Sequence, residues 1–462
     1  MPSAFPLLRR RGVVEISAKN LRFKTHMKKS RRSFLINSSK FVAATGLAGM
    51  LPTFSFSRNK TDDQINIALI GANSMGYADL IDALKLPNVT CVAICDIDDA
   101  VLQKRIPEIE KIQGKKPLQY KDHRKLLENK DIDAVIIATP DHWHCIQLID
   151  ACAAGKDVYV EKPIANSIYE ADLMVKAVRR SKSIVQVGQQ QRSGDHWKSA
   201  MDFVKAGKLG DIRKIQIWAN FNYGIGQPKL PDSPIPEGVD FDRWLGPAPS
   251  RSFNKNRFHG SWRMFWNYGG GLLTDWGVHL MDMALWAKDT NSMPLSVSAI
   301  GGNYAFPDHA HETFDTMSVH YAMPDHTISY EHAAGTETGP YGKSYGLAFT
   351  GNNGTIVIDR GSWDLLLEGK PDKTKIAPMP KQMGTEPHAT HLKNWIDCIR
   401  SRKEPVCPIE MGRLAAVYCH MGNIALRSGS TLTWKEATHN FGSNKAANAL
   451  LKPEYRKPWV LG

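Results

Sequence analysis

The sequence predicts two α/β domains: an N-terminal doubly wound parallel sheet and a C-terminal α+β domain with a large, mostly antiparallel open sheet. Its 462 residues exceed what one ordinary hydrophobic core holds. Apolar runs alternate with helical stretches up to about residue 190, which is typical of a parallel sheet. Later apolar runs follow one another without helices, which favours antiparallel strands. We therefore expect a leader over 1–60, a first domain over 61–190 and a second domain over 191–462.

The first domain is expected to alternate regularly between strands and helices. Its predicted strands cover residues 65–70, 89–94, 134–138, 157–160 and 185–187. The first predicted helix follows the glycine turn and ends near Ala83, and two further helices are predicted over 142–154 and 167–181. Ligands bind beyond the carboxyl ends of parallel strands, so the polar residues at those ends are candidates for a site.

The second domain is expected to begin with a helix over 195–206 and a strand over 212–221. Residues 222–260 are rich in Pro, Gly and aromatic residues, which predicts a long functional loop. The remaining predicted elements are a helix over 275–286, strands over 296–299, 316–321, 327–332, 347–350, 355–358 and 364–367, and helices over 388–401 and 409–428.

The net charge of +13 lies almost entirely in the leader. Residues 1–60 hold 13 Lys and Arg against one acid, so the other residues carry a net charge of +1. This distribution removes the main electrostatic argument for a nucleic-acid partner. Arg31-Arg32, followed by Phe34-Leu35 and a short apolar stretch, resembles a twin-arginine export signal, with Met27 as an alternative start. We expect export to the periplasm through the matching machinery, without membrane insertion after processing.

A glycine turn after the first strand predicts a dinucleotide-binding, Rossmann-type domain. The turn separates strand from helix, and an acid follows its last glycine by 20 residues, the spacing expected for a carboxylate on a ribose 2′-hydroxyl. The first glycine would form the tight turn, and the last would let helix and strand pack closely. The candidate cofactor-binding residues here are Gly71, Asn73, Ser74, Met75, Gly76 and Asp96.

Asn73 departs from the usual pattern, because it stands where a glycine normally lets the pyrophosphate approach. We expect it to tolerate left-handed backbone angles, so that the turn survives. The carboxylate of Asp96 would repel a 2′-phosphate, which favours NAD over NADP. Further cofactor contacts are expected where later strands end, at Thr139, Pro140, His144, Glu161 and Lys162.

A second group of residues carries the chemistry. Lys162 ends a parallel strand, and Gly269-Gly270-Gly271 precedes a predicted helix bearing Asp275 and His279. These two are four residues apart, so they would share one face of an α-helix. Asp282 follows in the next turn.

Taken together, these motifs resemble the Gfo/Idh/MocA family over roughly residues 63–462. The resemblance rests on the glycine turn with Asp96, on Glu161-Lys162-Pro163, and on the glycine run with Asp275, His279 and Asp282. The segments 244–249 and 421–425 look like the branch found in many exported bacterial members. The resemblance implies a nucleotide-binding domain, a second domain whose open sheet often makes oligomer contacts, and hydride transfer on a sugar or polyol.

The chemistry of the side chains agrees with that implication. Oxidation of a carbinol needs a base, and imidazole titrates near neutral pH, so His279 is the expected base. Lys162 would stabilise negative charge on the same oxygen, and Asp275 would orient the imidazole or bind another hydroxyl. Arg192, Trp262 and Arg263 are weaker substrate candidates, with a salt bridge or loop packing as alternatives.

No metal site is expected, because His309, His311 and Glu312 match no standard spacing. The seven cysteines form no C-x-x-C motif and are expected to be buried free thiols.

The expected function is NAD-dependent hydride transfer on a hydroxyl-bearing carbon of a sugar, glycoside or polyol, in a homo-oligomer. Soluble NAD is scarce outside the cytoplasm, so an exported enzyme would keep its cofactor and balance oxidation with reduction in one site. One alternative is a redox-assisted glycoside hydrolase or lyase that uses bound NAD. The other is a non-catalytic periplasmic sugar-binding protein.

Overall fold

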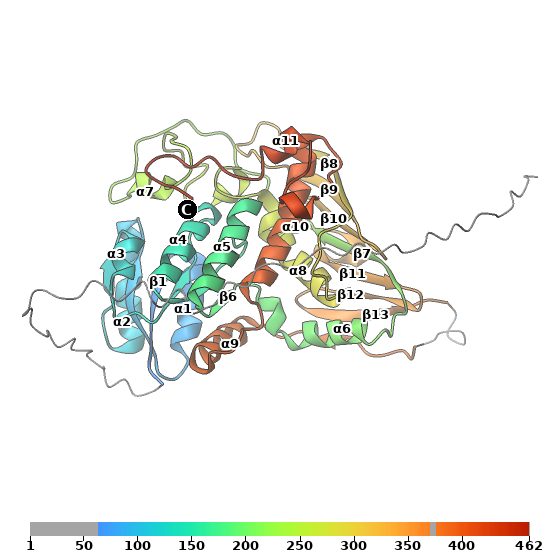
Figure 1. Ribbon diagram of the computed structural model, residues 1–462, viewed down its shortest axis with the longest axis horizontal. Coiled ribbons are helices and arrows are strands. Elements are labelled where there is room, and N and C mark those ends of the chain that lie inside the picture. The colour runs from blue at the N-terminus through green and yellow to red at the C-terminus, as the bar shows by residue number, and fades with distance from the viewer. Residues whose placement is uncertain (1–62, 370–375, 462) are drawn as a thin grey trace, which may run out of the picture. The chain divides into compact units, whose positions relative to one another are not determined.

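The computed structural model describes residues 63–369 and 376–461, which belong to one compact unit (Figure 1). The predicted leader and its paired arginines lie outside the described residues. The domain boundary near residue 190 remains a prediction.

The first sheet is parallel, as predicted, and has six strands in the order β3-β2-β1-β4-β5-β6. Its strands are β1 (Ile65–Ile70), β2 (Val89–Cys95), β3 (Leu118–Tyr120), β4 (Ala134–Ile137), β5 (Asp157–Val160) and β6 (Val185–Val187). The connecting helices are α1 (Ser74–Leu84), α2 (Asp99–Gln113), α3 (His123–Leu127), α4 (Asp141–Ala153) and α5 (Ile168–Ser181). Strands β1, β4 and β5 are buried along their whole length, as expected for a sheet covered on both faces.

The sheet is covered partly by a helix from the far end of the chain. Helix α9 (His388–Ser401) packs Leu392, Trp395 and Ile396 into the same hydrophobic cluster as α1 and one face of the sheet. His388 also bridges Asp79 and Asp82 of α1, at 2.8 and 2.6 Å. The predicted second domain therefore contributes a helix to the core of the first.

The second sheet has eight strands in the order β14-β13-β12-β11-β7-β10-β9-β8. They are β7 (Ile212–Ala219), β8 (Ser296–Gly302), β9 (Thr316–Ala322), β10 (Thr327–Ala333), β11 (Tyr345–Gly351), β12 (Gly354–Ile358), β13 (Ser362–Leu367) and β14 (Gln382–Met383). Most neighbours are antiparallel, as predicted, but β7 and β10 pair in parallel. The chain leaves β7 for the long loop and α8 before it returns, which makes a parallel pairing possible.

The remaining helices are α6 (Asp195–Lys205), α7 (Phe241–Leu245), α8 (Val278–Ala287), α10 (Ile409–Ser428) and α11 (Lys445–Asn448). The predicted long loop is interrupted by the short helix α7. The predicted helix over 275–286 is instead a π-helical turn, Leu273–Gly277, that runs into α8. After α11 the chain runs back to lie near α7 and α4 (Figure 1). Within the described ranges, no helix combines the length and apolar character needed to cross a membrane.

Candidate active site

A cleft of about 290 Å³ lies where β1, β2, β4 and β5 end. Segments 243–244 and 259–263 of the second domain also line it. Apart from Gly76, all predicted cofactor residues line this cleft, namely Gly71, Asn73, Ser74, Met75, Asp96, Thr139, Pro140, His144, Glu161 and Lys162. The carboxyl ends of the strands thus meet at one place, as the parallel topology requires.

Both glycines of the turn occupy positions where a side chain does not fit. Gly71 has φ +89°, and a Cβ there would lie 2.7 Å from the carbonyl oxygen of Ala138. A Cβ on Gly76 would lie 2.1 Å from the carbonyl oxygen of Gly71 and 2.8 Å from the Cβ of Ala138. The tight turn and the close approach of α1 to the sheet therefore have the roles expected of them.

Asn73 does not adopt the left-handed conformation expected of it. Its backbone is extended, with φ −101°, and its side-chain oxygen accepts a hydrogen bond from the amide of Ser74 at 2.9 Å. The positive φ, +42°, belongs to Ser74. The turn survives because the unusual angle has moved one residue along, while Asn73 caps the N-terminus of α1.

Asp96 lies in the cleft at the end of β2. Its two carboxylate oxygens accept hydrogen bonds from the amides of Ala72 (2.8 Å) and Asp98 (3.1 Å), which fixes its orientation. Burial raises the pKa of Asp96. Two free lone pairs remain available for hydroxyl donors, as a ribose contact requires.

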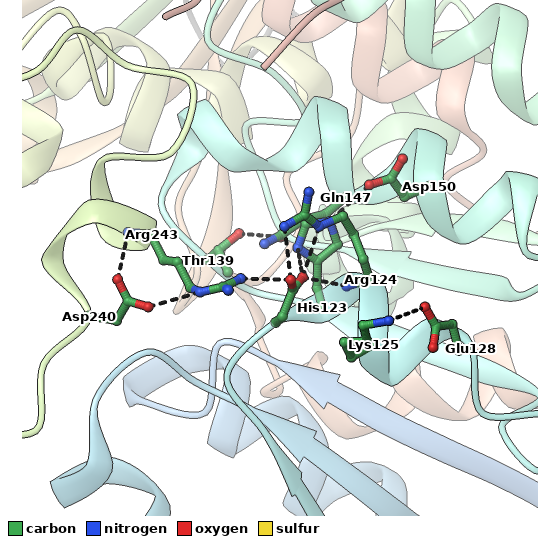
Figure 2. A network of polar contacts seen from close by, with 10 residues as sticks. His123, Arg124, Lys125, Glu128, Thr139, Gln147, Asp150, Asp240 and Arg243 are labelled. Atoms are coloured by element: carbon green, nitrogen blue, oxygen red, sulfur yellow. Dashed lines mark hydrogen bonds and ion pairs between the residues drawn. The ribbon is translucent and has the colours of Figure 1, made fainter. Parts of the chain in front are cut away.

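The segment 238–263, which we call the closing segment, is held against this end of the cleft by polar contacts. Arg243 pairs with Asp122 at 2.7 Å, and His259 contacts Asp98 at 2.9 Å. The amide of Asp240 donates to the carbonyl of Ile97 at 2.9 Å. Figure 2 shows Arg243 reaching toward the residues at the start of α3, with Asp240 beside it and paired with its side chain at 2.8 Å. The predicted functional loop is thus a wall of the dinucleotide cleft.

The first turn of α4 faces the cleft beside Thr139 and Pro140. His144 places its two ring nitrogens 2.8 Å from the carbonyl oxygen of Pro163 and 2.7 Å from that of Thr139. Burial lowers the pKa of His144 to about 4, so the neutral ring donates to one of these carbonyls. Asp141 does not cap α4, because the cap position is Pro140.

Lys162, Asp275 and Arg263 form a compact charged group. The Lys162 ammonium donates to Asp275 Oδ1 at 2.8 Å and to the Asp275 backbone carbonyl at 3.0 Å. Arg263 Nε donates to the same Oδ1 at 3.0 Å. Lys162 and Arg263 line the cleft, whereas Asp275 is buried behind them. Asp275 therefore positions two cations rather than orienting an imidazole.

His279 is buried near this group, and the described residues show no hydrogen bond between its ring and the carboxylate of Asp275. Its Nδ1 has no hydrogen-bond partner. Burial, followed by the charges of Lys162 and Arg360, lowers its pKa well below the usual range, so the ring is neutral at pH 7. Asp275 lies in the π-helical turn that runs into α8, and His279 lies in α8, so the two keep the expected four-residue helical spacing. The carboxylate of Asp275 nevertheless binds Lys162 and Arg263.

Two of the three weaker substrate candidates line the cleft. Trp262 is buried there, with the Arg263 guanidinium 4.2 Å from its ring centroid. Arg192 does not line the cleft. Its Nε and Nη2 donate to the two oxygens of Asp282 at 2.8 and 2.7 Å. Both side chains are buried, so Arg192 forms a buried salt bridge rather than the surface salt bridge offered as the alternative to substrate binding.

All seven cysteines are buried and free, as predicted. In the part of the chain that the structure describes, no group of three His, Cys, Asp or Glu side chains is arranged to hold a metal ion. His311 lies between two backbone carbonyls, and Glu312 pairs with Arg251 at 2.8 Å.

Sequence reasoning missed several residues of the cleft. Asp141, Arg243 and His259 line it although none belongs to a predicted site. Asp141 immediately follows a strand-end proline, and that position could have marked it as a candidate. Nothing local places Arg243 or His259 at the cleft, because the contacts that bring them there, with Asp122 and Asp98, are more than 100 residues away in the chain.

Comparison with known families agrees with this geometry. The profile of an oxidoreductase family with an NAD-binding Rossmann fold matches residues 65–189, and the profile of its C-terminal alpha/beta domain matches residues 198–356. The chain belongs to the Gfo/Idh/MocA family. Its cofactor is accordingly NAD, held by the fold that the glycine turn predicted.

Curated relatives align over part of this member only. An alpha-N-acetylgalactosaminidase from Shewanella oneidensis is 28% identical over 152 residues, which are 32% of this chain and 33% of that protein. A glycosyl hydrolase family 109 protein from Shewanella baltica is 30% identical over 154 residues, 32% of this chain and 34% of that protein. The match thus spans about a third of each relative.

Solved structures share the fold of this family member over most of its length. An aldose-aldose oxidoreductase from Caulobacter crescentus, complexed with glycerol, has a TM-score of 0.60 and 21% identity, covering 80% of this chain and 99% of that chain. A levoglucosan dehydrogenase complexed with NADH and levoglucosan has a TM-score of 0.60 and 18% identity, with the same coverage.

Proposed function

We propose that this protein is an NAD-dependent oxidoreductase that transfers hydride between the cofactor and a hydroxyl-bearing carbon of a sugar, glycoside or polyol. The observation that carries the proposal is that Lys162, an ammonium held by a buried carboxylate, lines the same cleft as Gly71 and Asp96. Bound NAD supplies a hydride acceptor and donor. The protein supplies the binding site, the orientation and the proton transfer.

The residues fit the dinucleotide. The turn at Gly71 leaves no room for a side chain and brings the start of α1 to the cleft, where a helix N-terminus favours the pyrophosphate. Asp96 would hold the ribose hydroxyls. Glu161 and Lys162 would flank the nicotinamide end, and burial raises the pKa of Glu161 to about 8.

Proton transfer is assigned to the charged group and its neighbour. Lys162 would hydrogen-bond the reacting oxygen and stabilise negative charge on it. His279 is the proposed acceptor of the hydroxyl proton. It is buried beside the cleft without lining it, and the burial that lowers its pKa also opposes its protonation, so the substrate hydroxyl would have to reach it past Lys162. Asp275 would keep Lys162 and Arg263 in place while the proton moves.

We further propose that the protein is exported and keeps its NAD. The paired arginines of the leader support export, and the closing segment supports retention, because it lines one side of the cleft and contacts Asp98 and Asp122. A cofactor held this way would need oxidation and reduction to balance in one site.

The relatives named as glycosyl hydrolases favour a second candidate, redox-assisted glycoside cleavage. In that reaction a hydroxyl would be oxidised to a carbonyl with hydride transfer to bound NAD, and the carbon next to the carbonyl would lose a proton as the aglycone leaves by elimination. Water would add to the unsaturated product in the hydrolase, or not in the lyase, and the hydride would return to the carbonyl, so the cofactor would end in its starting state. The third candidate, a sugar-binding protein without catalysis, would bind sugars but transfer no hydride.

One experiment separates these candidates. The protein is purified without added cofactor, assayed for NAD released on denaturation, and incubated with free sugars, polyols and 4-nitrophenyl glycosides, including the N-acetyl-α-galactosaminide. Absorbance of reduced cofactor supports the oxidoreductase. Nitrophenol release that requires bound NAD but leaves it oxidised supports redox-assisted cleavage. Sugar binding without either signal supports the binding protein and refutes both enzymes.

A further inference from the structure

One carboxylate on the wall of the cleft has no assigned role. Asp141 is the first residue of α4, is 3% exposed and lines the cleft. Among the described residues, no side chain or backbone amide donates a hydrogen bond to its carboxylate. Pro140 occupies the N-cap position of α4, so Asp141 does not cap the helix either.

A carboxylate in this position is costly to keep. Burying an acid without hydrogen bonds opposes its ionisation, and here burial raises the pKa of Asp141 well above its usual range. The charges of Arg263 and Lys162 lower that pKa, whereas those of Asp275 and Glu161 raise it. The protein therefore offsets the cost of Asp141 only in part, as is common at binding sites.

The cation that most strongly influences Asp141 also has unused donors. Arg263 gives its Nε to Asp275 and lies against the ring of Trp262, and its side chain is 34% exposed. Among the described residues, no acceptor binds its two terminal nitrogens. The cleft thus offers an acceptor at Asp141, donors at Arg263 and an aromatic face at Trp262.

We propose that Asp141 accepts a hydrogen bond from a substrate hydroxyl and, together with Arg263, selects an uncharged sugar that presents two neighbouring hydroxyls to this wall. The inference rests on the proposed function and specifies its substrate class. Three acids, Asp141, Asp275 and Glu161, lie around the two bases, Lys162 and Arg263, so the bases already face carboxyl groups of the protein rather than an open site for a sugar acid or sugar phosphate. A ligand carboxylate here would also lie against the carboxylate of Asp141.

The first test compares deoxy sugars. Binding of D-glucose and D-galactose, and of their monodeoxy analogues, is measured by tryptophan fluorescence in NAD-loaded wild type and in Asp141→Ala. Losing a hydrogen bond to a charged group should weaken binding of the parent sugar roughly 10- to 100-fold. The analogue lacking the recognised hydroxyl should bind both proteins equally. An equal loss for every analogue overturns the proposal.

The second test needs no substrate. Asp141→Asn keeps the shape and removes the buried charge, so the ligand-free variant should melt at a higher temperature than wild type. Asp195→Asn is the matched control, because Asp195 is also the first residue of a helix, α6, but is exposed and outside the cleft. A lower melting temperature for Asp141→Asn alone would identify Asp141 as a structural residue and overturn the proposal.

The outcomes also distinguish substrate from cofactor. NAD content should be the same in Asp141→Ala and wild type, and a large loss of NAD would assign the carboxylate to the cofactor instead. If wild type binds none of the free sugars, polyols and glycosides used to test the proposed function, the proposed function and this inference fall together. If wild type binds them and Asp141→Ala binds them equally well, this inference fails and the proposed function stands.

Discussion

The shared contact of Lys162 and Arg263 with Asp275 gives the most direct prediction. The Lys162–Asp275 pair is 2.8 Å long, with side chains 13% and 7% exposed, so both charges are largely removed from water. Removing one partner of such a pair leaves an unpaired buried charge, which costs about 3–5 kcal/mol. Arg263 is 34% exposed, so water compensates part of its loss.

We therefore expect Asp275→Asn to lower the free energy of unfolding by about 3 kcal/mol, mostly because the ammonium of Lys162 is left buried without its carboxylate partner. A double-mutant cycle with Lys162→Met, measured by chemical denaturation, should give a coupling energy of about 1–3 kcal/mol. The rate of bound-cofactor reduction in a single turnover should fall about 100-fold, while sugar binding changes little, because Asp275 holds the ammonium that stabilises the transition state.

A control pair separates positioning from stability. Arg413 and Asp172 join α10 to α5 at 2.6 Å, with both side chains 18% exposed and neither in the cleft. Asp172→Asn should reduce stability but leave the rate per folded molecule unchanged. Additive effects of Asp275→Asn and Lys162→Met to within about 0.5 kcal/mol, with an unchanged single-turnover rate, would refute the reasoning.

Four further predictions follow from the site and the leader. Gly71→Ala should weaken NAD binding at least about 30-fold, because its Cβ would lie 2.7 Å from a backbone oxygen at φ +89°, and NAD bound per chain measures this. His279→Ala should slow turnover by about 10²- to 10⁴-fold. In the wild type, protonation of His279 should lower the turnover rate only well below pH 6.5, and a pH–rate profile measures this. Burial opposes the protonation of His388, but two carboxylates raise its pKa to about 9. The ion pairs therefore stabilise the fold fully below pH 6.5, and this stabilisation is lost as the pH rises toward 9. His388→Gln should remove this pH dependence, which is on the order of 2 kcal/mol after solvent screening, in denaturation curves measured at several pH values. Replacing Arg31 and Arg32 by Lys should leave the protein in the cytoplasmic fraction of a cell that exports the wild type.

Each of these has a contrary outcome. Normal NAD content in the glycine variant would remove the turn from the cofactor site. A normal rate in the alanine variant would require another base. If the stability of His388→Gln depended on pH as that of the wild type does, the raised pKa of His388 would be refuted. If the lysine variant were still exported, the export signal would not depend on Arg31 and Arg32.

Local pattern was enough to predict the elements that depend on short-range physics. Strand β5 was predicted with its observed bounds, because a short apolar run between turn signals has few alternatives in a buried parallel sheet. Helices α9 and α10 also begin and end near the predicted residues. Gly71 and Gly76 have the steric roles expected of them, because backbone sterics at a turn are decided within a few residues. Their contact with the cofactor stays a prediction.

Tertiary structure decided what depends on contacts between distant segments. Neither the parallel pairing of β7 with β10 nor the packing of α9 on the first sheet is visible in local periodicity. The four-residue spacing of Asp275 and His279 is compatible with the observed helical run, but it could not show which groups the carboxylate of Asp275 would bind. Asp275 found its partners in Lys162 and Arg263 instead, since a carboxylate binds whichever cations the fold brings to it.

The sequence by itself therefore determined the two sheets, the dinucleotide turn and the identity of the residues at the strand ends. Only the tertiary structure showed which of those residues contact one another, which are engaged elsewhere, as Arg192 is by Asp282, and which, like Asp141, remain without a partner on the cleft wall. The reason is that steric and periodic preferences act along the chain, whereas ion pairing and burial act through space.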